Sequence, residues 1–116
     1  MKTVCDDTVP IGELAQVNPG NTALFEEFIN YLYSVHWEPD EIEIYEKDIQ
    51  TAWVWCLEEN DDRPYLQWRR KDIRSLCRWL RREKGRDRVS AKRMRRSLSV
   101  LDAYLDMSDK RINRKG

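Results

Sequence analysis

Apolar residues recur at intervals of three and four positions in four separate stretches of the chain, and this spacing is typical of helices with one buried face. It predicts helices over residues 22–36, 40–58, 70–84 and 91–106. Asn21 or Thr22 is predicted to cap the first helix, and Ser90 the fourth. Pro39 suits the first turn of the second helix. Because the chain has few internal turn residues, we expect an all-α fold, a single compact four-helix bundle.

The inward positions of these helices form the predicted core. They are Phe25, Phe28, Ile29, Leu32 and Val35; Ile42, Tyr45, Ile49, Ala52, Trp53 and Cys56; Ile73, Leu76, Cys77 and Leu80; and Ala91, Met94, Leu98, Leu101 and Leu105. Ile44 and Trp55 fall on the opposite side of the second helix and are predicted to be exposed. Gly85 follows the third helix, where a left-handed cap residue is wanted.

The length of 116 residues gives room for about one domain. Residues 1–20 show no sustained period and are predicted to form an N-terminal arm or linker. Residues 21–107 form the predicted helical domain. The segment "SDKRINRKG", residues 108–116, is predicted to be a fraying C-terminal tail or the start of an interdomain linker.

Charge is divided unevenly between the two halves of the chain. Residues 1–62 hold two Lys/Arg against fifteen Asp/Glu, a balance of −13, whereas residues 63–116 hold nineteen against six, a balance of +13. This asymmetry predicts an anionic partner for the second half. Attraction between the two halves also accounts for it, and both explanations can hold because surface ion pairs leave most of the field in place.

Cysteine usage and hydropathy narrow the class of protein further. Cys5, Cys56 and Cys77 are odd in number and lack C-x-x-C spacing, so neither a disulfide framework nor a zinc site is predicted. No secretory signal opens the chain, and the longest apolar run, residues 52–57, is too short to span a membrane. We therefore expect a cytoplasmic protein with no cofactor, no metal, no small-molecule ligand and no membrane partner.

The start of the fourth predicted helix concentrates positive charge. Its first two turns and the linker before them carry Arg86, Arg88, Lys92, Arg93, Arg95 and Arg96. Cations at this end oppose the helix macrodipole. Such a charge run is usually a solvated face, but its placement within the basic half favours nucleic acid. Basic first turns behind a small hydroxyl N-cap fit the major groove of duplex DNA, and no sheet motif of the single-stranded RNA type is present.

Four stretches follow one another in a recognisable order. They are "FEEFINYL", "IYEKDIQTAWVWCL", "LQWRRKDIRSLCRWLRREKG" and "SAKRMRRSLSVLDAYL". Together they resemble the core-binding domain that precedes the catalytic domain in tyrosine recombinases and phage integrases. That family has an F..YL helix, a Y..D(L/I) helix, an L…(T)xxDI helix ending in Gly, and an S..TI.R.LS.L..F..YL helix. The resemblance covers about residues 22–106 and implies a SAM-like helical bundle that clamps duplex DNA with the starts of its second and fourth helices.

Carried over to this sequence, the resemblance places Ser90, Lys92, Arg93 and Arg96 at the DNA. The basic run adds its remaining members, so the predicted DNA-binding set is Arg86, Arg88, Ser90, Lys92, Arg93, Arg95 and Arg96. The second helix departs from the family, because it begins with the acidic "EPDEIEI" where the family has a small hydroxyl and bases. This start, with Glu38, Asp40, Glu41 and Glu43, is predicted to face away from the duplex or to pack on a basic partner surface.

The resemblance also implies where catalysis is carried out. The family's Arg, Lys, His-x-x-Arg, second His or Trp, and nucleophilic Tyr belong to a second domain that this chain lacks. His36 has no H-x-x-R around it and is predicted to be a partly buried structural residue. We therefore predict no enzymatic activity and a duplex DNA-binding module, nucleoid-associated when bound, whose native chain also carries the catalytic domain. The alternative is a protein-interaction module that uses the acidic second helix and an exposed Trp55.

Overall fold

The computed structural model describes residues 14–83, 85 and 87–108, and its regular secondary structure there is entirely helical. The elements are α2 (Pro19–Ser34), α3 (Pro39–Glu59), the short 3-10 helix η1 (Tyr65–Gln67), α4 (Arg70–Arg82) and α5 (Arg88–Met107). The predicted all-α fold with four helices is confirmed. The chain divides into two compact units, Met1–Asp62 with α2 and α3, and Arg63–Gly116 with η1, α4 and α5.

Helix α2 begins a turn earlier than the apolar pattern predicted. Its N-cap is Asn18, whose side-chain oxygen accepts the Asn21 N–H at 2.8 Å, so the predicted cap at Asn21 or Thr22 is wrong. Pro19 takes the first helical position, where the N–H that proline lacks has no helical partner in any case. The short side chain of Asn18 and the proline after it therefore set this boundary.

Helix α2 ends in a Schellman motif, in which the residue after the C-cap has a left-handed backbone conformation. The Trp37 N–H donates to the Leu32 carbonyl at 3.2 Å, and the His36 N–H donates to the Tyr33 carbonyl at 3.1 Å. His36 holds the left-handed position with φ of 65°, where glycine is usual. Its side chain is exposed, so the prediction of a partly buried His36 is wrong.

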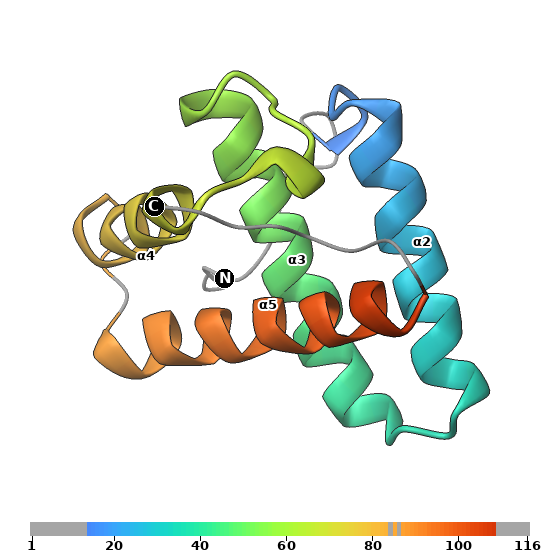
Figure 1. The fold of residues 1–116 in the computed structure, drawn as a ribbon. Coiled ribbons are helices and arrows are strands. Elements are labelled where there is room, and N and C mark those ends of the chain that lie inside the picture. Colours follow the sequence, from blue (N-terminus) through green and yellow to red (C-terminus); the bar gives the residue numbers. More distant parts are fainter. Residues whose placement is uncertain (1–13, 84, 86, 109–116) are drawn as a thin grey trace. The chain divides into compact units, whose positions relative to one another are not determined.

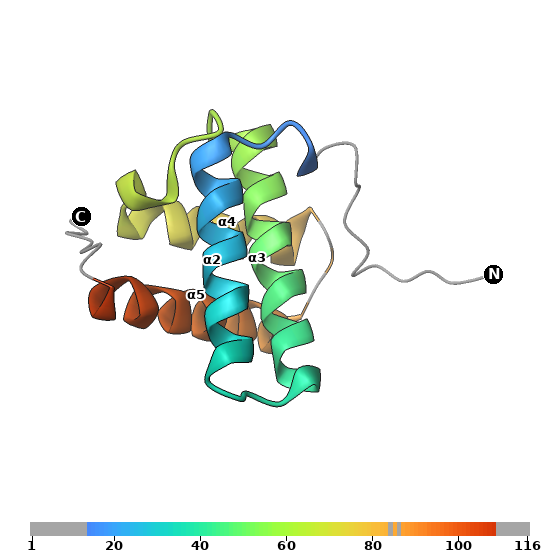
Figure 2. The same ribbon diagram turned by 90° about the vertical axis from the view of Figure 1, so that its right-hand side faces the viewer.

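Helices α2 and α3 run antiparallel, side by side (Figures 1 and 2). The indole N–H of Trp53 in α3 donates to the Asn21 carbonyl in α2 at 3.0 Å. Tyr45 of α3 contacts the Phe28 ring edge-on, with ring centroids 6.5 Å apart. Among the predicted core positions of α2, Phe25 is only half-buried and Val35 is exposed. Leu24 takes up part of the buried face instead.

Trp55 is buried, with 3% of its surface exposed, so the prediction of an exposed Trp55 is wrong. Residues 51–56 of α3 are all buried, which leaves this part of the helix without a solvent face. A helix that is apolar all round is one that is enclosed. Ile44, near the start of α3, is 40% exposed as predicted.

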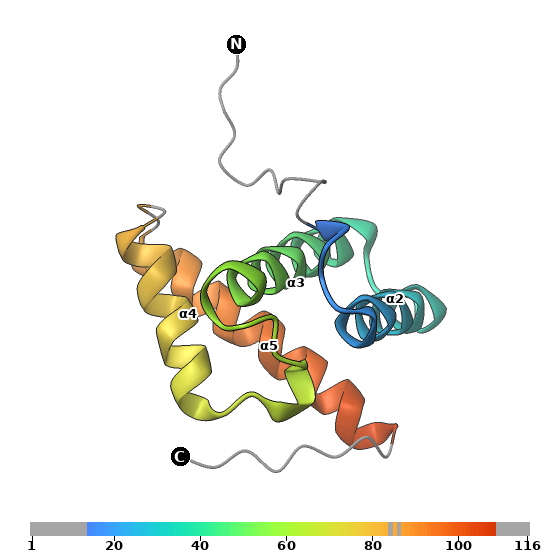
Figure 3. The ribbon, with the colours of Figure 1, turned by 90° about the horizontal axis from the view of Figure 1, so that it is seen from above.

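In the second unit, the end of α4 lies near the start of α5, and the two helices diverge towards their other ends (Figure 3). The segment with η1 lies on the open side of this V. There the Tyr65 hydroxyl donates to Asp102 of α5 at 2.6 Å, and the rings of Tyr65 and Trp68 lie 4.9 Å apart. The predicted core residues of α5 are all buried: Ala91, Met94, Leu98, Leu101 and Leu105. Gly85 is left-handed, with φ of 65°, as predicted.

Acidic side chains fix the starts of α4 and α5. The Asp72 carboxylate accepts a hydrogen bond from the Arg69 backbone N–H at 2.6 Å, which is one half of a capping box. The other half is missing, because the Arg69 side chain has no acceptor atom for the Asp72 N–H. At α5 the N-cap is Asp87, whose Oδ1 accepts the Ser90 N–H at 2.9 Å. The prediction of Ser90 as N-cap is therefore wrong. The helix starts three residues earlier than predicted and takes Arg88 out of the linker into its first turn.

Candidate nucleic-acid interface

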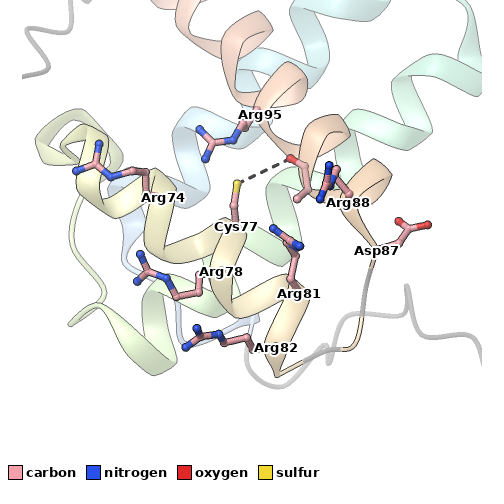
Figure 4. Close-up of a pocket in the computed structure, with 9 residues that line it drawn as sticks. Arg74, Cys77, Arg78, Arg81, Arg82, Asp87, Arg88 and Arg95 are labelled. Atoms are coloured by element: carbon pink, nitrogen blue, oxygen red, sulfur yellow. Dashed lines mark hydrogen bonds between the residues drawn. The ribbon is translucent and has the colours of Figure 1, made fainter.

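Helix α4, from Arg74 to its end, and the first turns of α5 border an open pocket of about 710 Å³ lined mostly by arginine (Figure 4). Its lining residues are Arg74, Cys77, Arg78, Arg81, Arg82, Asp87, Arg88, Ala91 and Arg95. We name this surface the arginine groove. Arg74, Arg78 and Arg81 of α4 recur at steps of four and three, which places them along one side of the helix, and Arg88 and Arg95 of α5 flank Ala91. Two helices thus contribute six arginines to the lining of one pocket.

The floor of the arginine groove is small and apolar. The Cys77 thiol is buried and contacts the Ala91 carbonyl at 3.8 Å. Burial raises the pKa of this thiol, and the nearby Arg95 guanidinium lowers it by a smaller amount. The thiol is therefore neutral near pH 7 and adds no negative charge. Small residues at this place let the two helices approach, so the long arginine side chains stand along the walls.

The positive charge of the groove is poorly compensated. Within the described ranges, no carboxylate forms an ion pair with Arg78, Arg81 or Arg82. Asp87 lies at the rim, and its carboxylate is directed away from the arginine side chains (Figure 4). It accepts the Ser90 N–H, and this hydrogen bond lowers the pKa of Asp87. Guanidinium groups in such a cluster repel one another, and an anion bound among them relieves that repulsion.

A second exposed face of α5 carries two more cations, Lys92 and Arg96, together with Val89. These three residues recur at spacings of three and four and are all exposed. None of them lines the arginine groove, which takes Arg88, Ala91 and Arg95 from the same helix. We name Val89, Lys92 and Arg96 the outer face of α5. The start of this helix therefore presents basic side chains on two adjoining sides.

The structure separates the residues predicted to bind DNA into three groups. Arg88 and Arg95 line the arginine groove, and Lys92 and Arg96 belong to the outer face of α5. Ser90 and Arg93 are half-buried on the same helix. Arg86 lies outside the described residues.

The sequence-based site omitted four residues that the structure adds: Arg74, Arg78, Arg81 and Arg82 of α4. The signal for them was present, because bases at steps of three and four mark one side of the third predicted helix. That spacing does not say which neighbouring helix shares the side. The packing of α4 against α5 supplies this information.

Comparison with family models, with curated proteins and with solved structures finds no match to this chain. Over the part of the chain that the structure describes, no three His, Cys, Asp or Glu side chains gather as they would around a metal ion. None of the described helices combines the length and apolar character needed to cross a membrane.

Proposed function

We propose that the protein binds duplex DNA through its second unit, as the DNA-binding module of a tyrosine recombinase or phage integrase. The observation that carries the proposal is the arginine groove, an open pocket that six arginines from two helices line. Guanidinium groups recognise phosphate by paired hydrogen bonds as well as by charge. In this proposal the arginine groove of the protein holds one stretch of the phosphate backbone, and the outer face of α5 enters the adjacent major groove of the duplex.

A duplex is favoured over a single strand by the side chains around the basic surface. Proteins that hold single strands without sequence preference stack the bases on exposed aromatic rings. The large apolar side chains exposed in the described part of the second unit are Leu66, Val89 and Met107, and none is aromatic. Trp79 and Tyr104 are only half-buried, but neither lines the arginine groove.

The acidic start of α3 fits this proposal if it is turned away from the duplex. Glu38, Asp40, Glu41 and Glu43 are all exposed, and among them Glu43 forms an ion pair with Lys47 at 3.6 Å. We propose that this acidic surface meets a basic protein partner, of which the catalytic domain of the native recombinase is the expected one. The alternative of a protein-interaction module built around Trp55 loses its contact residue, because that side chain is buried.

The proposal is tested by the salt dependence of duplex binding, measured by fluorescence anisotropy with a labelled duplex. Each lost phosphate contact flattens the slope of log K against log salt by about 0.9. The double variant Arg78→Gln/Arg82→Gln should lower affinity and flatten the slope. The control Arg70→Gln/Lys71→Gln removes the same charge from exposed positions of α4 outside the groove and should do so much less. Equal effects of the two variants, or no duplex binding, would contradict the proposal.

A further inference from the structure

Val89 is the most exposed large apolar residue in the described part of the chain, with 71% of its surface open to solvent. It stands in the first turn of α5, next after Arg88. A β-branched side chain has no advantage there, because it lowers helix propensity slightly and contributes nothing to the core. A single exposed valine on a protein surface is ordinary. Its surroundings are what give this one a use.

Cations surround Val89 on both sides of the helix. On the outer face of α5, Lys92 and Arg96 follow it at three and seven residues, so they lie on the same side. The arginine groove adjoins this face, with Arg88 and Arg95 on the wall formed by α5. An anionic polymer held by these cations therefore brings its own surface against the valine. The Val89 side chain has no hydrogen-bonding atom, so its favourable contact is with an apolar group of that polymer.

We infer that Val89 contacts the 5-methyl group of a pyrimidine in the major groove, an inference that rests on the proposed duplex binding. The methyl group of thymine is the apolar feature among the base edges that this groove displays, and 5-methylcytosine presents a methyl group at the same ring position. The major groove is wide enough for a helix, and phosphate contacts fix the register of the helix in it. Val89 thus gives the module a preference for methylated pyrimidines.

The test compares two A·T-rich duplexes of the same sequence, about two helical turns long, one with thymine and one with uracil in both strands. Wild-type protein should bind the uracil duplex about fourfold more weakly for each methyl group that it covers. The Val89→Ala variant should bind both duplexes alike. Val89→Ile, which keeps a branched apolar side chain, should retain the preference, and so should Met107→Ala, which removes another exposed apolar side chain of α5.

A second arm separates the two possible sources of the methyl group. In a C·G-rich duplex, 5-methylcytosine in place of cytosine adds the same group, and a gain in wild type but not in Val89→Ala extends the preference to this base. A thymine-to-uracil ratio that is the same in wild type and Val89→Ala, with salt-dependent binding intact, overturns the inference and leaves the proposed function standing. No duplex binding by the wild type overturns both.

Discussion

Asn18 and Asp62 are joined by three hydrogen bonds that tie the start of α2 to the end of α3. The Asn18 amide N–H₂ donates to the Asp62 carbonyl at 2.9 Å and to its Oδ1 at 3.1 Å, and the Asn18 backbone N–H donates to the same Oδ1 at 3.2 Å. The remaining Asn18 oxygen caps α2. The Asn18 side chain therefore uses both its amide N–H₂, as donor, and its amide oxygen, as acceptor. Asp62, which accepts from the N–H₂ group, has a left-handed backbone conformation with φ of 51°.

We expect Asn18→Asp to destabilise the protein by about 1–3 kcal/mol, because it loses the two part-buried hydrogen bonds that the Asn18 amide donates, each contributing about 0.5–1.5 kcal/mol. An aspartate keeps the cap oxygen but loses the amide donor and sets a carboxylate beside that of Asp62. Asn18→Ser is the matched control, since it also keeps a cap oxygen without adding charge. Urea denaturation should rank the free energies of unfolding as wild type, then Asn18→Ser, then Asn18→Asp. An aspartate variant as stable as the serine variant would show that the carboxylate pair is harmless.

His36→Gly should stabilise the protein by about 0.5–1 kcal/mol. A non-glycine residue in the left-handed region is strained, and glycine removes that strain at some cost in unfolded-state entropy. The exposed imidazole gives up no packing in exchange. Thermal unfolding of His36→Gly and of His36→Ala measures the effect, since alanine keeps the strain of a Cβ. A glycine variant no more stable than the alanine variant would contradict the Schellman assignment.

The sequence predicted the buried faces of the helices better than their ends. Apolar spacing places Leu98, Leu101 and Leu105 inward, because one face of a helix repeats every three or four residues. Helix starts depend instead on single caps. Asn18 and Asp87 lie outside the apolar pattern, so the pattern placed both starts about three residues late.

The errors on exposed residues have a different origin. The helical wheel predicts an exposed Trp55, although residues 51–56 are nearly all apolar, which is typical of an enclosed segment. The sequence predicts the arginines on one side of each helix separately, but it does not predict that the two sets line one arginine groove. That Arg78 on α4 and Arg95 on α5 line the same pocket is a property of the packed unit.

We expect the free energy of unfolding to fall at alkaline pH because the Cys77 thiol ionises. Because burial raises the pKa of this thiol in the folded chain, the thiol contributes stability that is fully present below its ordinary pKa of 9.0 and is lost as pH rises through the higher folded value. Cys77→Ala removes this dependence. Urea denaturation between neutral pH and about pH 10 should therefore show a steeper loss in wild type than in the variant. Parallel profiles would mean that the Cys77 thiol titrates alike in both states.

Arg95 partly offsets the effect of burial on Cys77, because its guanidinium favours the thiolate. Arg95→Gln should therefore shift the pH dependence of Cys77 alkylation by iodoacetamide to higher pH. Mass spectrometry of the peptide that contains Cys77 measures the extent of alkylation. Arg70→Gln, outside the arginine groove, should leave the pH profile unchanged. The same shift in both variants would place the charge effect elsewhere than in the groove.

Asp87→Asn should strengthen duplex binding several-fold at low salt. Asparagine is as good an N-cap as aspartate, so α5 keeps its start while the rim of the arginine groove loses a negative charge. The lowered pKa of Asp87 means that its stabilising contribution is present above the ordinary value of 3.8 and is lost as pH falls through the folded value. Asp87→Asn should abolish this acid sensitivity, measured by hydrogen exchange of the Ser90 amide.

Asp87→Ala separates the cap from the charge, because it removes both. Its α5 start should exchange faster at every pH, and its duplex affinity should gain less than that of Asp87→Asn, since a frayed first turn holds Arg88 and Val89 less firmly. Salt supplies a further check, because the advantage of Asp87→Asn comes from charge and should shrink as ionic strength rises. An advantage that persists unchanged at high salt, or an Asp87→Asn affinity equal to that of wild type, would mean that phosphates do not approach this rim of the arginine groove.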